Sequence, residues 1–168
     1  QGVSSAASDV YKRQAQGRMT IHLRPHHLLC LLTYVGKGYG DAFIRNYDRI
    51  AQRLSMGEAI MVVDGPDDIC APLLTDLDAH CRRAGVTARD ADALHDMAGI
   101  LAIGVGDTLS LDPATLSDMR TAFASGRSRG ACAGCEWEAL CSVVARDGFA
   151  GARVRLAEGG AKAMCCGS

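Results

Sequence analysis

Three cysteines in the C-terminal third of the chain, Cys132, Cys135 and Cys141, have the spacing Cys-x2-Cys-x5-Cys. Two residues between cysteines let a tight turn aim both sulfur atoms at one point, and Gly134 supplies the backbone freedom for that turn. Zinc ions and iron–sulfur clusters both use Cys-x2-Cys pairs. Because a cuboidal cluster needs its thiolates spread over a wider object than one ion, the later third cysteine favours a 4Fe-4S cluster.

A helix that begins at Cys135 is expected to carry Cys141. The unpaired N–H groups and the positive end of the helix dipole lower the pKa of thiols at such a position. We therefore expect the thiols of this segment to ionise readily and to stabilise a negatively charged cluster.

The fourth ligand must come from a remote part of the chain, where Cys70, Cys30 and Cys81 compete. Cys70 follows an Asp-rich turn, and a loop places a ligand more easily than a helix interior does. Cys30 lies in an apolar helical segment, where a buried structural thiol is the alternative interpretation. We rank Cys70 first, Cys30 second and Cys81 third. The predicted metal ligands are Cys132, Cys135, Cys141 and Cys70, and the remaining pair of thiols is either structural or used in redox chemistry.

A polar group composed of Arg24, His26, His27, Asp67 and Asp68 defines a second candidate site. Iron–sulfur clusters also accept imidazole ligands, but hydrogen bonding to the backbone or to a carboxylate is the simpler role for two histidines at a helix start. The two aspartates have a simple role as turn or N-cap residues. As a catalytic cleft beside the metal, this group would support a metal-assisted enzyme. The sequence contains no recognised catalytic motif, so we do not expect the chain to be an enzyme by itself.

Three functions are compatible with these residues. The leading hypothesis is a 4Fe-4S protein for electron transfer or redox sensing, which requires a redox partner protein. The first alternative is an interaction module stapled by zinc, and the second is the metal-assisted enzyme. The sequence leaves the oligomeric state open.

The composition narrows the class of protein. A chain of 168 residues with 48% hydrophobic content can bury one core, so we expect a single domain. The formal net charge is −1 and the basic residues are scattered, which argues against a nucleic-acid partner. No apolar run reaches the roughly 18 residues that would span a bilayer. Eight cysteines without a signal peptide indicate a reducing cytoplasm rather than a secreted disulfide scaffold.

Both ends of the chain differ from the middle. Residues 1–18 lack periodicity, and Asp9 to Gln14 resembles the translation of a transposase-derived sequencing adapter. We therefore assign 1–18 to a non-native or disordered segment, 19–156 to a single cysteine-rich domain, and 157–168 to a disordered or non-native tail. The adjacent Cys165 and Cys166 are excluded as ligands, because neighbouring cysteines bind one metal poorly.

Hydrophobic periodicity and the residues that start and stop helices predict a helix-dominated α+β domain with a small sheet of short strands. In the helix over Ala88–Ile100, Ala91, Leu94, His95 and Ala98 recur at helical spacing and form the expected inner face. The expected strands are Ile21–Leu23, Ala59–Val63 and Thr108–Leu111, and the other expected helices cover Arg24–Leu32, Asp41–Leu54, Pro72–Arg83 and Pro113–Phe123.

Four segments in this order resemble the bacterial and archaeal family catalogued as domain of unknown function 1284. They are Leu23–Cys30, Gly36–Tyr39, Val63–Cys70 and Cys132–Trp137 followed by Cys141, and the similarity covers about Ile21 to Leu156. The resemblance implies a cytoplasmic protein that binds an iron–sulfur cluster through residues of these segments. The resemblance does not imply any catalysed reaction. Some members carry a further cysteine where this chain has Leu73, a departure that argues against a second complete cluster here.

Overall fold

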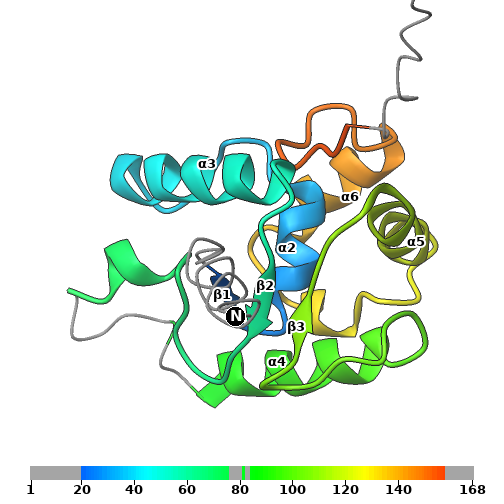
Figure 1. Ribbon diagram of the computed structural model, residues 1–168, viewed down its shortest axis with the longest axis horizontal. Coiled ribbons are helices and arrows are strands. Elements are labelled where there is room, and N and C mark those ends of the chain that lie inside the picture. Colours follow the sequence, from blue (N-terminus) through cyan, green and yellow to red (C-terminus); the bar gives the residue numbers. More distant parts are fainter. Residues whose placement is uncertain (1–19, 76–80, 82–83, 158–168) are drawn as a thin grey trace, which may run out of the picture.

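The computed structural model describes residues 20–75, 81 and 84–157. The segment 1–18 and the tail from 158 onward lie outside this part of the chain, so the domain boundaries remain predictions. Within the described residues, five α-helices surround a three-stranded sheet (Figure 1), which confirms the helix-dominated α+β class. The strands are β1 (Ile21–Leu23), β2 (Ile60–Val62) and β3 (Thr108–Leu109), and the helices are α2 (His27–Thr33), α3 (Asp41–Ser55), α4 (Ala84–Met97), α5 (Pro113–Ala124) and α6 (Glu138–Arg146).

The sheet has the order β1-β2-β3, with β1 parallel to β2 and β2 antiparallel to β3. All three strands lie where the sequence predicts them, although β2 and β3 are shorter than expected. Leu23 on β1 lies opposite Val62 on β2, and both side chains are buried. The sheet therefore fixes the turn that follows β1 against the core.

Helix α2 lies at the centre of the molecule (Figure 1) and packs against α5 and α6. Its buried leucines are Leu28, Leu29, Leu31 and Leu32. The helix begins at His27, three residues later than predicted, because Pro25 and His26 form a turn in which the N–H of His27 donates to the Arg24 carbonyl at 3.0 Å. A residue before proline is disfavoured in helical conformation, which explains why Arg24 lies outside the helix.

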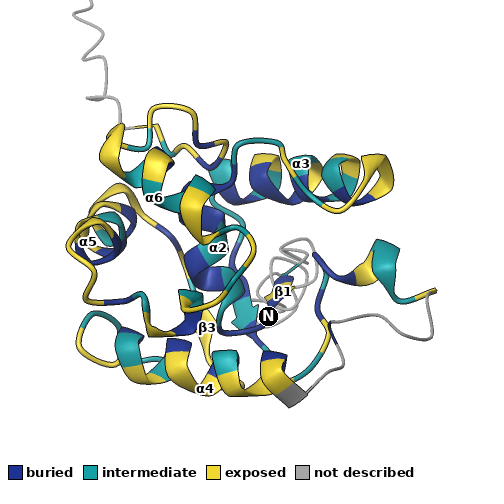
Figure 2. Ribbon diagram, turned by 180° about the vertical axis from the view of Figure 1, so that it is seen from behind, coloured by how far each residue is buried: buried dark blue, intermediate teal, exposed yellow. Residues whose placement is uncertain are grey.

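Helix α3 is amphipathic, as its apolar spacing predicts. Its inner face is buried and its outer face is exposed (Figure 2). Among the described residues, no helix combines the length and the apolar character needed to cross a membrane. The buried residues of α3 are Phe43, Tyr47, Ile50, Ala51 and Leu54, and Ile44 is half-buried.

Helix α4 presents a different face to the core from the one predicted. Ala91, His95 and Ala98 are exposed, whereas Ala93 and Met97 are fully buried. The buried face also includes Asp90, a polar residue that periodicity alone assigns to solvent. The helix expected over Ala88–Ile100 is confirmed, but the residues that face the core are Val86, Asp90, Ala93 and Met97.

Arg53 near the end of α3 and Glu58 after it form a two-contact ion pair, in which Arg53 Nε lies 2.8 Å from Glu58 Oε2. Hydrogen bonding from Arg53 lowers the pKa of Glu58. The pair therefore contributes stability above the unfolded-state pKa of about 4.3, and this contribution disappears as the pH falls through the lower folded-state pKa.

We expect Glu58→Gln to lower the free energy of unfolding by at most about 1 kcal/mol at pH 7, because the pair lies near the surface. The difference from the wild type should shrink as the pH falls below about 4 in urea unfolding experiments. Asp118→Asn, at an exposed position of α5, is the control. A difference that stays constant down to strongly acidic pH would contradict this role of the pair.

Candidate metal centre

The three-cysteine segment forms a compact turn between α5 and α6. A single 3-10 turn covers Gly130–Cys132, and the Gly130 N–H donates to Asp96 Oδ2 on α4 at 2.6 Å. The N–H of Cys135 donates to the carbonyl of Cys132 at 3.0 Å, and Gly134 between them has a φ of +67°. The predicted tight turn with a permissive glycine is therefore present.

Helix α6 begins at Glu138, with Trp137 at its N-cap position, rather than at Cys135. Cys141 lies in the first turns of this helix. Burial raises the pKa of Cys132 and of Cys141, with Arg129 and Thr33 respectively acting in the opposite direction. The expectation of thiols activated by the helix start was therefore wrong for these two residues. A metal bound here must displace protons from the thiols, so its affinity depends on pH.

Cys30 on α2 completes a group of four thiols. One cavity is lined by Cys30, Cys132, Cys135 and Cys141. Burial, followed by the charges of the other three cysteines, raises the pKa of Cys30 well above its usual value. This arrangement favours Cys30 over Cys70 as the fourth member, the reverse of the order ranked from the sequence. We call Cys30, Cys132, Cys135 and Cys141 the four-thiol group.

The four-thiol group adjoins a larger cavity of about 100 Å³. A single water needs about 10–15 Å³ measured in this way, so the cavity can hold a group several times larger. The aromatic rings of Tyr39 and Trp137 also line it and meet edge to face at 5.6 Å. The two rings therefore cover this part of the cavity with aromatic surface. The polar and sulfur-bearing residues at its wall include Arg24, His26, His27, Cys30, Cys70, Cys81, Cys135 and Cys141.

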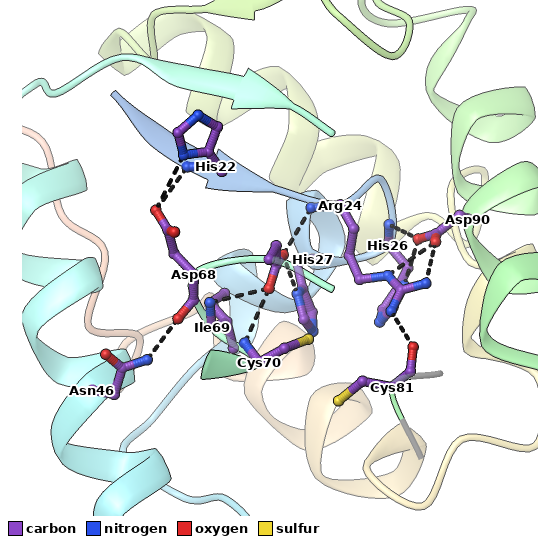
Figure 3. Close-up of polar contacts among 11 residues, drawn as sticks. His22, Arg24, His26, His27, Asn46, Asp68, Ile69, Cys70, Cys81 and Asp90 are labelled. Atoms are coloured by element: carbon purple, nitrogen blue, oxygen red, sulfur yellow. Dashed lines mark hydrogen bonds and ion pairs between the residues drawn. The ribbon is translucent and has the colours of Figure 1, made fainter. Parts of the chain in front are cut away.

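The side chain of Arg24 is almost fully buried at the base of this cavity, with 1% exposed. Its Nε and Nη2 donate to Asp90 Oδ2 at 2.9 and 2.6 Å, and Nη1 donates to the carbonyl of Cys81 at 2.7 Å (Figure 3). Its backbone N–H donates to Asp67 Oδ2 at 2.7 Å. Arg24 thus joins the turn after β1 to α4, to the segment at Cys81 and to the loop after β2.

Each of the two histidines is held by its own carboxylate. His26 Nδ1 lies 2.7 Å from Asp90 Oδ1, and His27 Nδ1 lies 2.6 Å from Asp67 Oδ2 (Figure 3). An ionised carboxylate only accepts hydrogen bonds, so the proton of a neutral ring sits on Nδ1 and the lone pair on Nε2. Burial, followed by the neighbouring His27, lowers the pKa of His26 to about 4. At neutral pH, His26 is therefore an uncharged imidazole.

Asp67 has the predicted turn role and a second one. Its Oδ1 accepts hydrogen bonds from the N–H groups of Ile69 and Cys70, at 3.0 and 3.1 Å, while its Oδ2 binds His27. Burial favours the protonated form, but His27 and the backbone donors outweigh it and hold the pKa of Asp67 at about 2. The carboxylate therefore stays ionised.

Asp68 faces away from this group. One of its carboxylate oxygens accepts from the backbone N–H of His22 at 2.9 Å, and its carbonyl accepts from Asn46 at 2.8 Å (Figure 3). Of the five residues in the predicted polar cleft, Arg24, His26, His27 and Asp67 come together and Asp68 does not.

Asp90 is the residue that sequence reasoning missed. Local spacing gave no signal for it, because its burial goes with a partner 66 residues away in the chain, Arg24. A carboxylate on the apolar face of an amphipathic helix needs a buried cation or several donors. Arg24 and His26 supply both.

A second sulfur-containing group lies beside the first. His27, Asp67 and Cys70 each place one ligand-capable atom within 4.8 Å of the others. Cys70 also interacts directly with Cys81. The six described cysteines therefore divide into the four-thiol group and a pair, Cys70 and Cys81, next to His27. Both sets are compatible with metal binding.

A family model described as "Protein of unknown function (DUF1284)" matches residues 38–141. The matched range contains the three-cysteine segment together with Cys70 and Cys81, while the segment from Arg24 to Cys30 precedes it. No curated protein and no solved structure shows significant similarity to the chain.

The buried pair of Arg24 and Asp90 should dominate the stability of this region. We expect Asp90→Ala to lower the free energy of unfolding by about 3–5 kcal/mol, because it leaves the Arg24 guanidinium buried without its counter-charge. Asp92→Ala, at an exposed position of the same helix, should change it by less than about 0.5 kcal/mol. Urea unfolding measures both values.

The double variant Arg24→Met/Asp90→Leu separates two causes of the lost stability, the unpaired buried charge and the lost packing. It should recover a large part of the stability lost in Asp90→Ala, because neither charge then remains buried alone. Equal losses in Asp90→Ala and Asp92→Ala would show that the pair does not support the fold.

Proposed function

The chain belongs to this family of unknown function, and we propose that it binds one 4Fe-4S cluster through Cys30, Cys132, Cys135 and Cys141. One observation carries the proposal: a thiol of α2 and three thiols of the C-terminal segment line the same cavity. Four cysteine thiolates are the usual ligands of such a cluster.

The donor set fits a cluster in both chemistry and placement. The four thiols come from three separate elements, namely α2, the turn after α5 and helix α6, and they surround a space instead of converging from one short loop. A second cavity continues from this space toward Tyr39 and Trp137. The Cys-x2-Cys turn alone would suit a zinc ion as well as a cluster. The space between the thiols and the adjoining cavity favours a cluster of several atoms over a single zinc ion.

Groups around the thiols can stabilise and tune a cluster. The Thr33 hydroxyl donates to Cys141 Sγ at 3.1 Å, and the Arg129 guanidinium acts on the Cys132 thiol. Arg129 is itself fixed by Ser142 Oγ at 2.9 Å and lies over the Phe123 ring. Hydrogen bonds to sulfur and nearby positive charge help to set the reduction potential of an iron–sulfur cluster. Both contacts would stabilise a negatively charged, reduced state.

The role that we propose for the cluster is electron exchange with a redox partner protein. A 4Fe-4S cluster supplies one-electron chemistry, and each of the four thiols is only half-buried. A cluster near the surface can exchange electrons with a docked partner or respond to oxidants as a sensor. Reduced thiols require a reducing compartment, which favours the cytoplasm.

The cysteine variants Cys30→Ser and Cys70→Ser provide the test. After anaerobic reconstitution, the wild type should be brown and contain about four irons and four acid-labile sulfides per chain. We expect Cys30→Ser to lose the brown colour and most of the sulfide, because a member of the four-thiol group is removed. Cys70→Ser is the matched control and should keep both.

Acid-labile sulfide is the deciding measurement, because a single metal ion brings none. A colourless wild type that binds one zinc and no sulfide would refute the cluster and favour the zinc-stapled module. Loss of sulfide in Cys70→Ser with retention in Cys30→Ser would refute the assigned ligands. Circular dichroism of each variant separates cluster loss from unfolding.

A further inference from the structure

Two buried thiols are left over once the four-thiol group is assigned. Cys70 is 2% exposed and Cys81 is 4% exposed, and their side chains interact. Both line the larger cavity. Figure 3 shows them on the same side of the Arg24 network, with the sulfur of Cys70 directed toward the His27 ring. A thiol pair is therefore enclosed beside an imidazole.

His27 is oriented as metal-binding histidines usually are. Its Nδ1 is engaged by Asp67 at 2.6 Å, so in the neutral ring the lone pair lies on Nε2. Among the described residues, no hydrogen-bond partner is found for Nε2. A histidine that ligates a metal through one ring nitrogen almost always donates its other N–H to a carboxylate or carbonyl, which fixes the tautomer and the direction of the ring.

Asp67 itself is occupied as an acceptor. It receives the N–H groups of Arg24, Ile69 and Cys70 together with the ring of His27, which accounts for about four lone-pair sites of a carboxylate. It therefore serves as the orienting carboxylate and not as a further ligand. His27 and Cys70 place ligand-capable atoms within 4.8 Å of each other, and Cys81, whose side chain interacts with Cys70 and lines the same cavity, is the further thiol available to an ion.

We propose that His27, Cys70 and Cys81 form a second metal site, which holds a single thiophilic divalent cation such as Zn²⁺ separately from the cluster. Two thiolates and one imidazole are a known donor set for catalytic zinc, in which the fourth position binds water or substrate. The three side chains line one cavity together with Leu73 and His26, so a water or a small ligand could reach a metal held by them.

The charges balance when the ion binds. A divalent cation replaces the protons of the two thiols, so two protons are released to solvent and the thiolate charges are neutralised by the metal. The metal supplies the charge that compensates two thiolates in a buried setting. The hydrogen bond from Arg24 to the Cys81 carbonyl, at 2.7 Å, holds the backbone of the more distant ligand in place.

The experiment is an anaerobic titration of the metal-free chain with Co²⁺, a spectroscopic substitute for zinc. Cobalt bound by thiolates absorbs in the visible and near-ultraviolet regions. We expect His27→Gln, Cys70→Ser and Cys81→Ser each to bind one equivalent of Co²⁺ fewer than the wild type. His22→Gln, a histidine outside the cavity, is the matched control and should bind as the wild type does. Asp67→Asn should retain the site with about 10–100-fold weaker affinity.

The test separates this proposal from the cluster. Cys135→Ser should lose the cluster and keep the cobalt equivalent that depends on His27. Unchanged cobalt stoichiometry in His27→Gln and Cys70→Ser would overturn the second site whether or not the cluster assembles. If the cluster does not form but His27→Gln and Cys70→Ser each still bind one Co²⁺ fewer than the wild type, the second site is supported and the cluster is not.

A measurement on the unmutated protein guards against variants that do not fold. X-ray absorption of the Zn²⁺-loaded, cluster-containing wild type should show sulfur at about 2.3 Å together with nitrogen at about 2.0–2.1 Å. Coordination by sulfur alone, or no retained zinc, would overturn the proposal.

Discussion

The buried guanidinium of Arg24 is the constraint on which the rest of the candidate site depends. Removing a charge from water is costly, and the cost is offset only when geometry and hydrogen bonding are good on every side. Asp90 and the carbonyl of Cys81 meet that requirement for the guanidinium, and Asp67 accepts the backbone N–H of the same residue. The same two aspartates orient His26 and His27. Arg24 therefore links the turn after β1 to α4 and His26 through its guanidinium, and to Asp67 and His27 through its backbone N–H.

Local signals predicted much of the fold. Alternation identified β1, helical spacing identified α3, and the Asp-Pro pair marked the start of α5, where Asp112 accepts the Thr115 N–H at 2.7 Å. These features depend on near neighbours in the chain. The exposed face of α4 could not be deduced in this way, because its rotation is set by a partner more than 60 residues away.

The candidate site also has parts that local sequence signals predict and parts that depend on contacts between remote segments. The Cys-x2-Cys turn and its permissive glycine are local, and the sequence was sufficient to predict them. Choosing Cys30 over Cys70 required the packing of α2 against α6, which no spacing reveals. His27 and Cys30 lie three residues apart on α2, so adjacent side chains of one short helix face the two different sulfur groups. The separation between these groups is thus fixed by the rise of a helix and not by a loop.

The position of Cys30 near the start of the described chain, far from its three companions, bears on the order of assembly. Contacts between segments remote in sequence form late, because the intervening chain must first be ordered. During synthesis, Cys30 leaves the ribosome long before Cys132 to Cys141. Until α6 docks on α2, this thiol lies on an incomplete surface where oxidants and stray metal ions can reach it. Helix α6, which follows the other helices of the described residues, is therefore the one that encloses the first cysteine of the group.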